Sequence, residues 1–92
     1  MGKIKGTTST GFQFEIDPII VQDMEWVDMI AEVEETPYLV GKFIEKTIGK
    51  EQKKALYDHV RKDGHVLKDD VDREVGEIIE ACGQQDEDVK NS

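Results

Sequence analysis

The sequence predicts a mainly α-helical protein: a small bundle of three to four short helices, with a short N-terminal β-hairpin and a disordered C-terminal tail. Three observations lead to this prediction. Between Phe12 and Ile16, apolar and polar residues alternate with the period of a β-strand. From Met24 to Cys82, apolar residues recur at the three- and four-residue spacing of amphipathic helices. After Gly83, the only aliphatic residue is Val89, which is too little to pack a segment.

A chain of 92 residues is the size of one domain. We assign residues 1–83 to a single globular domain, in which residues 1–16 are extended and residues 17–83 are helical. Residues 84–92 form the expected tail. At this size the hydrophobic core is thin, because only about 60–65% of the unfolded surface becomes buried.

Turn and cap residues set the expected element boundaries in the first half of the chain. Ser9-Thr10-Gly11 supplies the hairpin turn, since glycine adopts positive φ at no steric cost. Asp17 caps a first helical turn that begins at Pro18. Asp23 is a second candidate cap, for a helix from Met24 to about Glu35. Pro37 ends this helix because it disfavours helical geometry at the residue before it.

Three further helices are expected, at Tyr38–Ile48, about Lys50–Lys62 and about Lys68–Cys82. Gly49 separates the first two, and Gly83 ends the last, as glycine commonly does after a helix. Gly41 and Gly76 fall inside these helices, where glycine costs about 1 kcal/mol relative to alanine. Close helix contacts would explain both glycines, and so would misplaced boundaries.

The formal net charge is −9, and its distribution is uneven. Such a chain repels phosphate backbones and anionic membranes, so neither nucleic acid nor a membrane is an expected partner. Eight acidic residues and no base lie between Glu15 and Glu35, whereas seven basic and three acidic residues lie between Thr36 and Lys62. These segments are able to pair within one molecule or between copies, and we therefore expect self-association.

No constellation for catalysis, metal binding or cofactor binding is present, so the chain is not expected to be an enzyme. Cys82 falls on the apolar face of the last expected helix, so we expect it to be buried as a small hydrophobic side chain. The spacing of His59 and His65 matches no common zinc site. An EF-hand loop that began at Asp70 would place Val75 where glycine is required. A single cysteine and no long apolar run fit a protein of the reducing cytosol.

Beyond these patterns, the order of residues along most of the chain resembles a known family. The segments that carry the resemblance are Lys5-Gly6-Thr7-Thr8, Thr10-Gly11-Phe12-Gln13-Phe14-Glu15-Ile16-Asp17, Asp23-Met24-Glu25-Trp26-Val27, Leu39 to Ile48, Gly49-Lys50-Glu51-Gln52, Leu56, His59-Val60-Arg61, Gly64-His65-Val66 and Lys90-Asn91-Ser92. They are similar to segments of the tail assembly chaperones of long-tailed bacteriophages and prophages. The similarity is diffuse and contains no single diagnostic motif.

The resemblance implies a largely helical, self-associating protein of the host cytoplasm that is absent from the finished virion. It implies that the protein binds the tape measure protein and keeps it soluble while the tail tube assembles. The major tail protein is a second candidate partner. Many family members have a longer frameshifted form. A different class stays open as the alternative: an acidic inhibitor or DNA mimic that blocks a host nucleic-acid-binding protein.

Three large aromatic residues, Trp26, Tyr38 and Phe43, are the expected protein-interaction residues. Such side chains dominate the energetics of interfaces, and the domain is too small to bury every large group. The competing interpretation places all three in the core.

Overall fold

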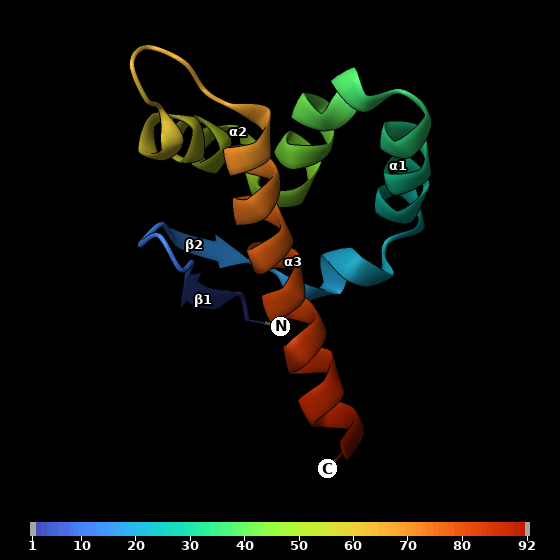
Figure 1. Cartoon of the computed structure of the whole chain (residues 1–92). Helices are drawn as coiled ribbons and strands as arrows, with labels where there is room; N and C mark the ends of the chain where they lie inside the picture. The colour runs from blue at the N-terminus through green and yellow to red at the C-terminus, as the bar shows by residue number, and fades with distance from the viewer. Residues whose placement is uncertain (1, 92) are drawn as a thin grey trace.

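The computed structural model describes the backbone of residues 2–91 and the side chains of residues 2–83. Within these residues a two-stranded antiparallel sheet is followed by three α-helices and two short 3-10 helices (Figure 1). The elements are β1 (Ile4–Thr7), β2 (Gln13–Ile16), η1 (Pro18–Gln22), α1 (Met24–Glu35), η2 (Pro37–Leu39), α2 (Val40–Val60) and α3 (Lys68–Asn91). The predicted mainly helical class with an N-terminal hairpin is confirmed.

The hairpin forms around the predicted turn. Ile4 pairs with Ile16 and Gly6 with Phe14, and the Thr8 N–H donates to the Phe12 carbonyl at 2.9 Å. Gly11 has a φ of 94°, which only glycine adopts at no steric cost. The ring of Phe14 lies over Gly6, so that a Cβ at Gly6 would come 2.6 Å from Phe14 Cζ. Glycine at this position therefore makes room for a core aromatic.

A side chain from α2 closes the outer edge of β2. The Glu15 N–H donates to Gln52 Oε1, and Gln52 Nε2 donates to the Glu15 carbonyl, both at 2.7 Å. The Gln52 amide thus makes the pair of hydrogen bonds that a neighbouring strand would make. A two-stranded hairpin is marginal by itself in water, and this contact attaches it to a helix.

The predicted caps are in place. Asp17 Oδ1 accepts a hydrogen bond from the Ile19 N–H at 3.0 Å, at the start of η1. Asp23 Oδ1 accepts one from the Glu25 N–H at 2.9 Å, at the start of α1. Both contacts satisfy backbone donors that the first helical turn leaves free. The predicted helix from Met24 to about Glu35 is confirmed.

Gly49 divides α2 into two helical segments, as the sequence predicts. Its φ of 86° and ψ of 162° are not helical, and the helix kinks there. The predicted separation of helices at Gly49 is thus confirmed, and the second segment ends at Val60 rather than Lys62. Asp63 and Gly64, with φ of 51° and 82°, then turn the chain toward α3.

Two expectations about glycines in the helices need correction. A Cβ at Gly76 would meet nothing within 4 Å, so no close helix contact explains this glycine. The helix α3 passes Gly83 and continues to Asn91, because Gly83 does not adopt the positive φ that ends helices. The predicted tail, residues 84–92, lies outside the part of the chain whose side chains are described.

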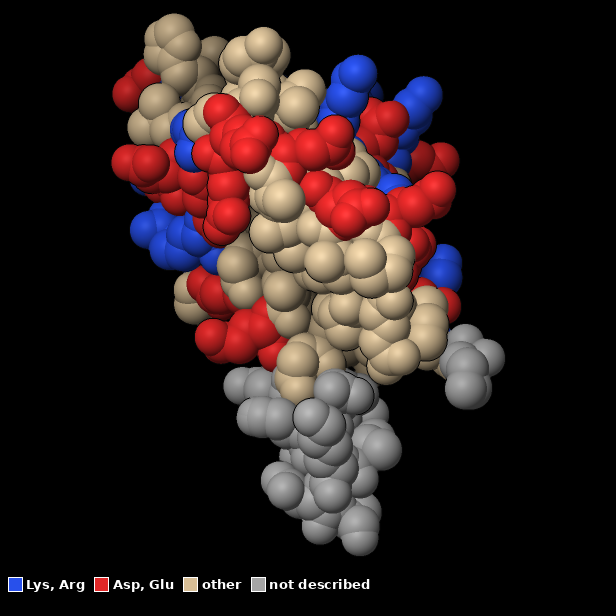
Figure 2. Space-filling model, turned by 90° about the vertical axis from the view of Figure 1, so that its right-hand side faces the viewer, with Lys and Arg blue, Asp and Glu red and all other residues tan. Residues whose placement is uncertain are grey.

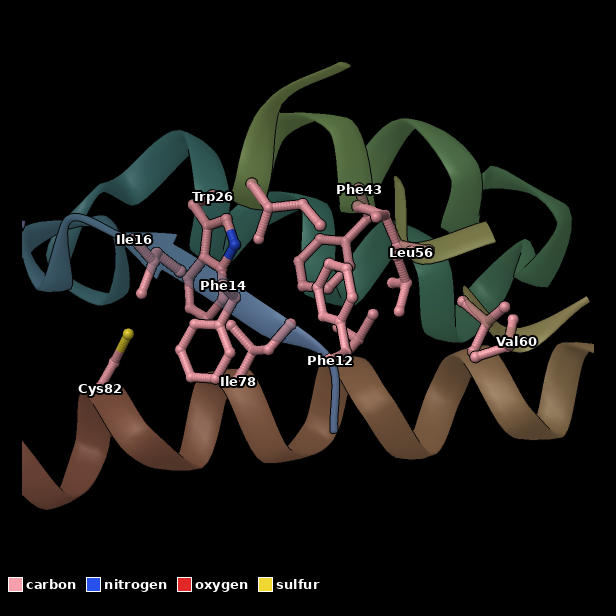
Figure 3. Close-up of a cluster of buried hydrophobic side chains, with 13 residues drawn as sticks. Phe12, Phe14, Ile16, Trp26, Phe43, Leu56, Val60, Ile78 and Cys82 are labelled. Atoms are coloured by element: carbon pink, nitrogen blue, oxygen red, sulfur yellow. The ribbon is translucent and has the colours of Figure 1, made fainter. Parts of the chain in front are cut away.

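One hydrophobic core joins the hairpin to all three α-helices (Figure 3). The labelled side chains of Phe14 and Ile16 lie between α3 on one side and α1 with α2 on the other. The buried apolar residues are Phe12, Phe14, Ile16, Trp26, Phe43, Ile44, Ile48, Leu56, Val60, Val71, Val75, Ile78 and Cys82. The strand β2 therefore contributes side chains to the core between the helices.

Replacement of Gly6 by alanine tests this packing. The Gly6→Ala Cβ would overlap the ring of Phe14, which is buried and has little space to move. We expect a loss of about 1–3 kcal/mol in the free energy of unfolding, measured by urea denaturation. The matched control is Gly76→Ala, where the Cβ meets open space and stability should rise by up to about 1 kcal/mol. Equal stability of the wild type and Gly6→Ala would contradict the packing.

Candidate partner-binding surface

Two of the three predicted interaction residues belong to the core. Trp26 is 4% exposed and Phe43 is 7% exposed, and their rings stack with centroids 5.5 Å apart. The Trp26 Nε1–H donates to Thr47 Oγ1 at 2.8 Å, which satisfies the polar end of the indole. This corrects the expectation that Trp26 and Phe43 anchor a partner, because α1 packs against α2 through the face that carries Trp26.

Tyr38, the third predicted residue, is 86% exposed and stands at the mouth of an apolar groove. The groove has a volume of about 540 Å³, and η2, both segments of α2, the loop before α3 and the first turns of α3 contribute to it. Its lining residues are Pro37, Tyr38, Val40, Tyr57, Val66, Lys68, Val71 and Asp72. Sequence periodicity does not reveal this groove, because its walls come from segments far apart in the chain.

The two charged residues that line the groove, Lys68 and Asp72, pair with each other. Lys68 Nζ lies 2.6 Å from Asp72 Oδ2, and this hydrogen bond raises the pKa of Lys68. Lys53 Nζ lies 3.6 Å from Glu45 Oε2 and 5.6 Å from the centroid of the Tyr57 ring. Because these charged groups already have partners, the apolar side chains are the part of the groove that is left for a partner to contact. The surface suits an apolar side chain of a partner, since burial of such groups drives association.

A buried polar cluster ties the hairpin turn to the helices. Glu74 of α3 is 0% exposed, and its two carboxyl oxygens accept hydrogen bonds from Thr8 Oγ1 at 2.6 Å and Thr10 Oγ1 at 2.7 Å. Thr8 Oγ1 also accepts from the Phe12 N–H at 3.1 Å. Beside it, Ser9 donates to Glu77 through its N–H and its hydroxyl, both at 2.7 Å, which lowers the pKa of Glu77.

His59 extends this cluster without making it a catalytic triad. Its Nε2 lies 3.0 Å from Thr10 Oγ1, whose hydroxyl donates to Glu74. In a triad the histidine stands between the hydroxyl and the acid, so that it takes the hydroxyl proton. Here the hydroxyl of Thr10 stands between His59 and Glu74, an order suited to holding the turn in place. Sequence reasoning missed Glu74, although its position between Val71 and Val75 puts it on the buried face of α3.

Cys82 is buried in the core, as the sequence predicts. Burial raises the pKa of its thiol, and the negative charge of Asp17 raises it further. The thiolate is the reactive form of cysteine, so this environment suppresses nucleophilic chemistry. In the part of the chain that the structure describes, no three His, Cys, Asp or Glu residues are grouped to hold a metal ion. No helix within that part is long and apolar enough to cross a membrane.

The reactivity of Cys82 provides a test. We expect a thiol reagent to label the native protein far more slowly than the protein unfolded in guanidinium chloride. Because the pKa of the thiol is raised in the folded state, its neutral form stabilises the fold and ionisation opposes it. Stability should therefore fall as pH rises past the ordinary thiol range, and Cys82→Ala should remove that part of the decline. Rapid labelling of the native protein at neutral pH would contradict the burial.

Comparison with known proteins adds no relative to this picture. No protein-family model matches the chain, and no curated protein or solved structure matches it either. The groove beside Tyr38 and the diffuse sequence resemblance to tail assembly chaperones are therefore the features that bear on function.

Proposed function

We propose that this protein is a tail assembly chaperone of a long-tailed bacteriophage or prophage. In this proposal it binds the tape measure protein, keeps it soluble and assists assembly of the tail tube. The observation that carries the proposal is the apolar groove beside Tyr38, an open surface for apolar side chains on a small acidic protein. The family resemblance supplies the identity of the partner.

The physical requirements of such a chaperone agree with this surface. A tape measure protein is long and helical, and its apolar faces stay uncovered until the tube surrounds them. Large exposed apolar patches cause aggregation, so a transient cover is needed. The cover must also be released, which favours a small contact around a few anchors over a broad obligate interface. The groove beside the exposed aromatic residue Tyr38 fits a contact of this kind.

The proposal includes further features that follow from the family. The protein acts in the host cytoplasm, self-associates and is left out of the mature virion. The major tail protein is a second candidate partner. We propose no catalytic step, metal ion or cofactor.

One observation favours the alternative function, an acidic inhibitor or DNA mimic. The helix α1 carries five acidic residues and no base. A mimic of nucleic acid needs negative charge along a continuous face, however, and the neighbouring helix α2 carries five lysines, Lys42, Lys46, Lys50, Lys53 and Lys54. The chaperone proposal therefore has the stronger support.

Co-expression with the tape measure protein tests the proposed function. The wild-type protein should raise the soluble yield of the tape measure protein and co-purify with it. Tyr38→Ala should remove most of that gain, because truncation of an aromatic hot spot of an interface costs about 2 kcal/mol or more. Its helical circular dichroism should be unchanged, since the Tyr38 side chain is exposed.

The matched control is Ile19→Ala, which truncates another exposed apolar side chain outside the groove. This variant should retain the solubilising activity. If Tyr38→Ala and Ile19→Ala behave alike, the groove is not the binding site. If the wild type neither solubilises nor co-purifies with the tape measure protein, the chaperone function is refuted and the acidic inhibitor becomes the leading hypothesis.

A further inference from the structure

The helix α1 carries apolar residues on two sides. Its inner side carries Trp26, Ile30 and Val33, which pack into or against the core. On its outer side Met24 is 65% exposed and Val27 is 39% exposed. Ala31, also exposed, continues the series at the i, i+3, i+7 spacing of one helix face. The outer face of a surface helix is usually polar, so this apolar strip needs an explanation.

Acidic residues border the strip on both sides. At about 100° per residue, Glu34 falls on one side of the strip, and Asp28 and Glu35 fall on the other. All three side chains are exposed. Figure 2 views the molecule from the side on which α1 lies and shows uncharged surface between acidic groups, with Lys and Arg mainly toward the edges.

Most of the acidic residues of α1 have no cationic partner among the described side chains. Lys46 pairs with Asp23 at 3.6 Å and with Glu25 at 3.7 Å, both at the start of α1. Among the side chains of residues 2–83, none of the later acids of α1 forms an ion pair. These acids are Asp28, Glu32, Glu34 and Glu35. Their charge is therefore available to a group from outside.

We propose that the outer face of α1 is a second interaction surface, which docks a basic amphipathic helix of a partner protein. The apolar strip of Met24, Val27 and Ala31 would contact the apolar seam of the incoming helix. Lys or Arg residues beside that seam would pair with the acids that border the strip, as charged flanking positions do in paired helices. This goes beyond the proposed chaperone function, because no residue of α1 lines the groove beside Tyr38.

The basic helix of a second copy is a poorer match. The helix α2 has lysines, but the large exposed apolar residues of the described chain are Ile19, Met24, Val27, Tyr38 and Leu67, none of which belongs to α2. A second α2 would thus offer charge without an apolar seam. The occupant that satisfies both features of the strip is a helix with apolar and basic residues together.

Two synthetic helical peptides of about 20 residues, long enough to form stable helices, provide the test. One carries Leu at the seam positions and Lys beside them, and the other carries Glu in place of each Lys. Fluorescence anisotropy of the labelled peptides should show binding of the basic peptide to the full-length protein and none of the acidic one. The affinity should fall at least tenfold between about 0.1 M and about 1 M salt, as the Debye length shortens from about 10 Å to about 3 Å. Equal binding of both peptides, or of neither, would overturn the proposal.

Charge-reversal variants locate the surface. Asp28→Lys with Glu35→Lys should weaken binding of the basic peptide by about tenfold or more. The matched control, Glu51→Lys with Glu80→Lys, makes the same change in net charge at exposed sites outside α1 and should retain most of the affinity. Met24→Gln with Val27→Gln should also weaken binding, since it removes the strip. Similar losses in both charge-reversal pairs would show attraction to net charge alone and overturn the assignment to α1.

The outcome separates this proposal from the chaperone function. Tyr38→Ala should bind the basic peptide as the wild type does, because Tyr38 lies outside α1. Peptide binding without solubilisation of the tape measure protein would support this surface and refute the chaperone function. Solubilisation without peptide binding would support the chaperone function and refute this surface. If sedimentation shows that reversal of Asp28 and Glu35 changes only self-association, with the peptide unbound, the strip is a contact between copies and the proposal is wrong.

Discussion

The fold depends on one buried carboxyl group, that of Glu74. Its two oxygens hold Thr8 and Thr10, the residues that begin the hairpin loop, against α3. Burial of a carboxyl group without hydrogen-bond partners would be costly. The two hydroxyls supply hydrogen bonds to the Glu74 carboxyl group, and the same contacts fix the loop in place. A free two-stranded hairpin would be marginal. Once the loop is fixed, Phe12 and Phe14 lie between the helices and complete the core.

This arrangement also decides which side chains remain for binding. Because the hairpin and three helices share one small core, Trp26 and Phe43 are used internally, stacked on each other. Among the large apolar side chains left exposed are Tyr38 on η2 and Met24 with Val27 on α1. Tyr38 stands at a groove whose charged lining residues pair with each other, and Met24 and Val27 lie on a strip bordered by acids that form no ion pair with the described side chains. As proposed binding surfaces, the two would select partners by different chemistry.

The sequence predicted the parts of this structure that local chemistry controls. The caps Asp17 and Asp23, the turn at Gly11 and the kink at Gly49 each follow from one residue and its immediate neighbours. The burial of Trp26 and Phe43 depends on which helices meet, and the groove depends on where η2 stands relative to α3. Periodicity does not fix these relations. Glu74 shows the same limit, because a charged residue on an apolar face signals burial only when its partners, 64 and 66 residues away, are known.

The most direct test of the account is a double-mutant cycle between Thr8 and Glu74, with stability measured by urea denaturation. Thr8→Val removes one hydroxyl donor, Glu74→Gln changes the acceptor, and the double variant closes the cycle. If this contact fixes the hairpin on α3, both single variants should be destabilised and their coupling should be about 1 kcal/mol or more. Effects that add to within about 0.5 kcal/mol would show that Thr8 and Glu74 act independently, and would contradict the central role of this interaction.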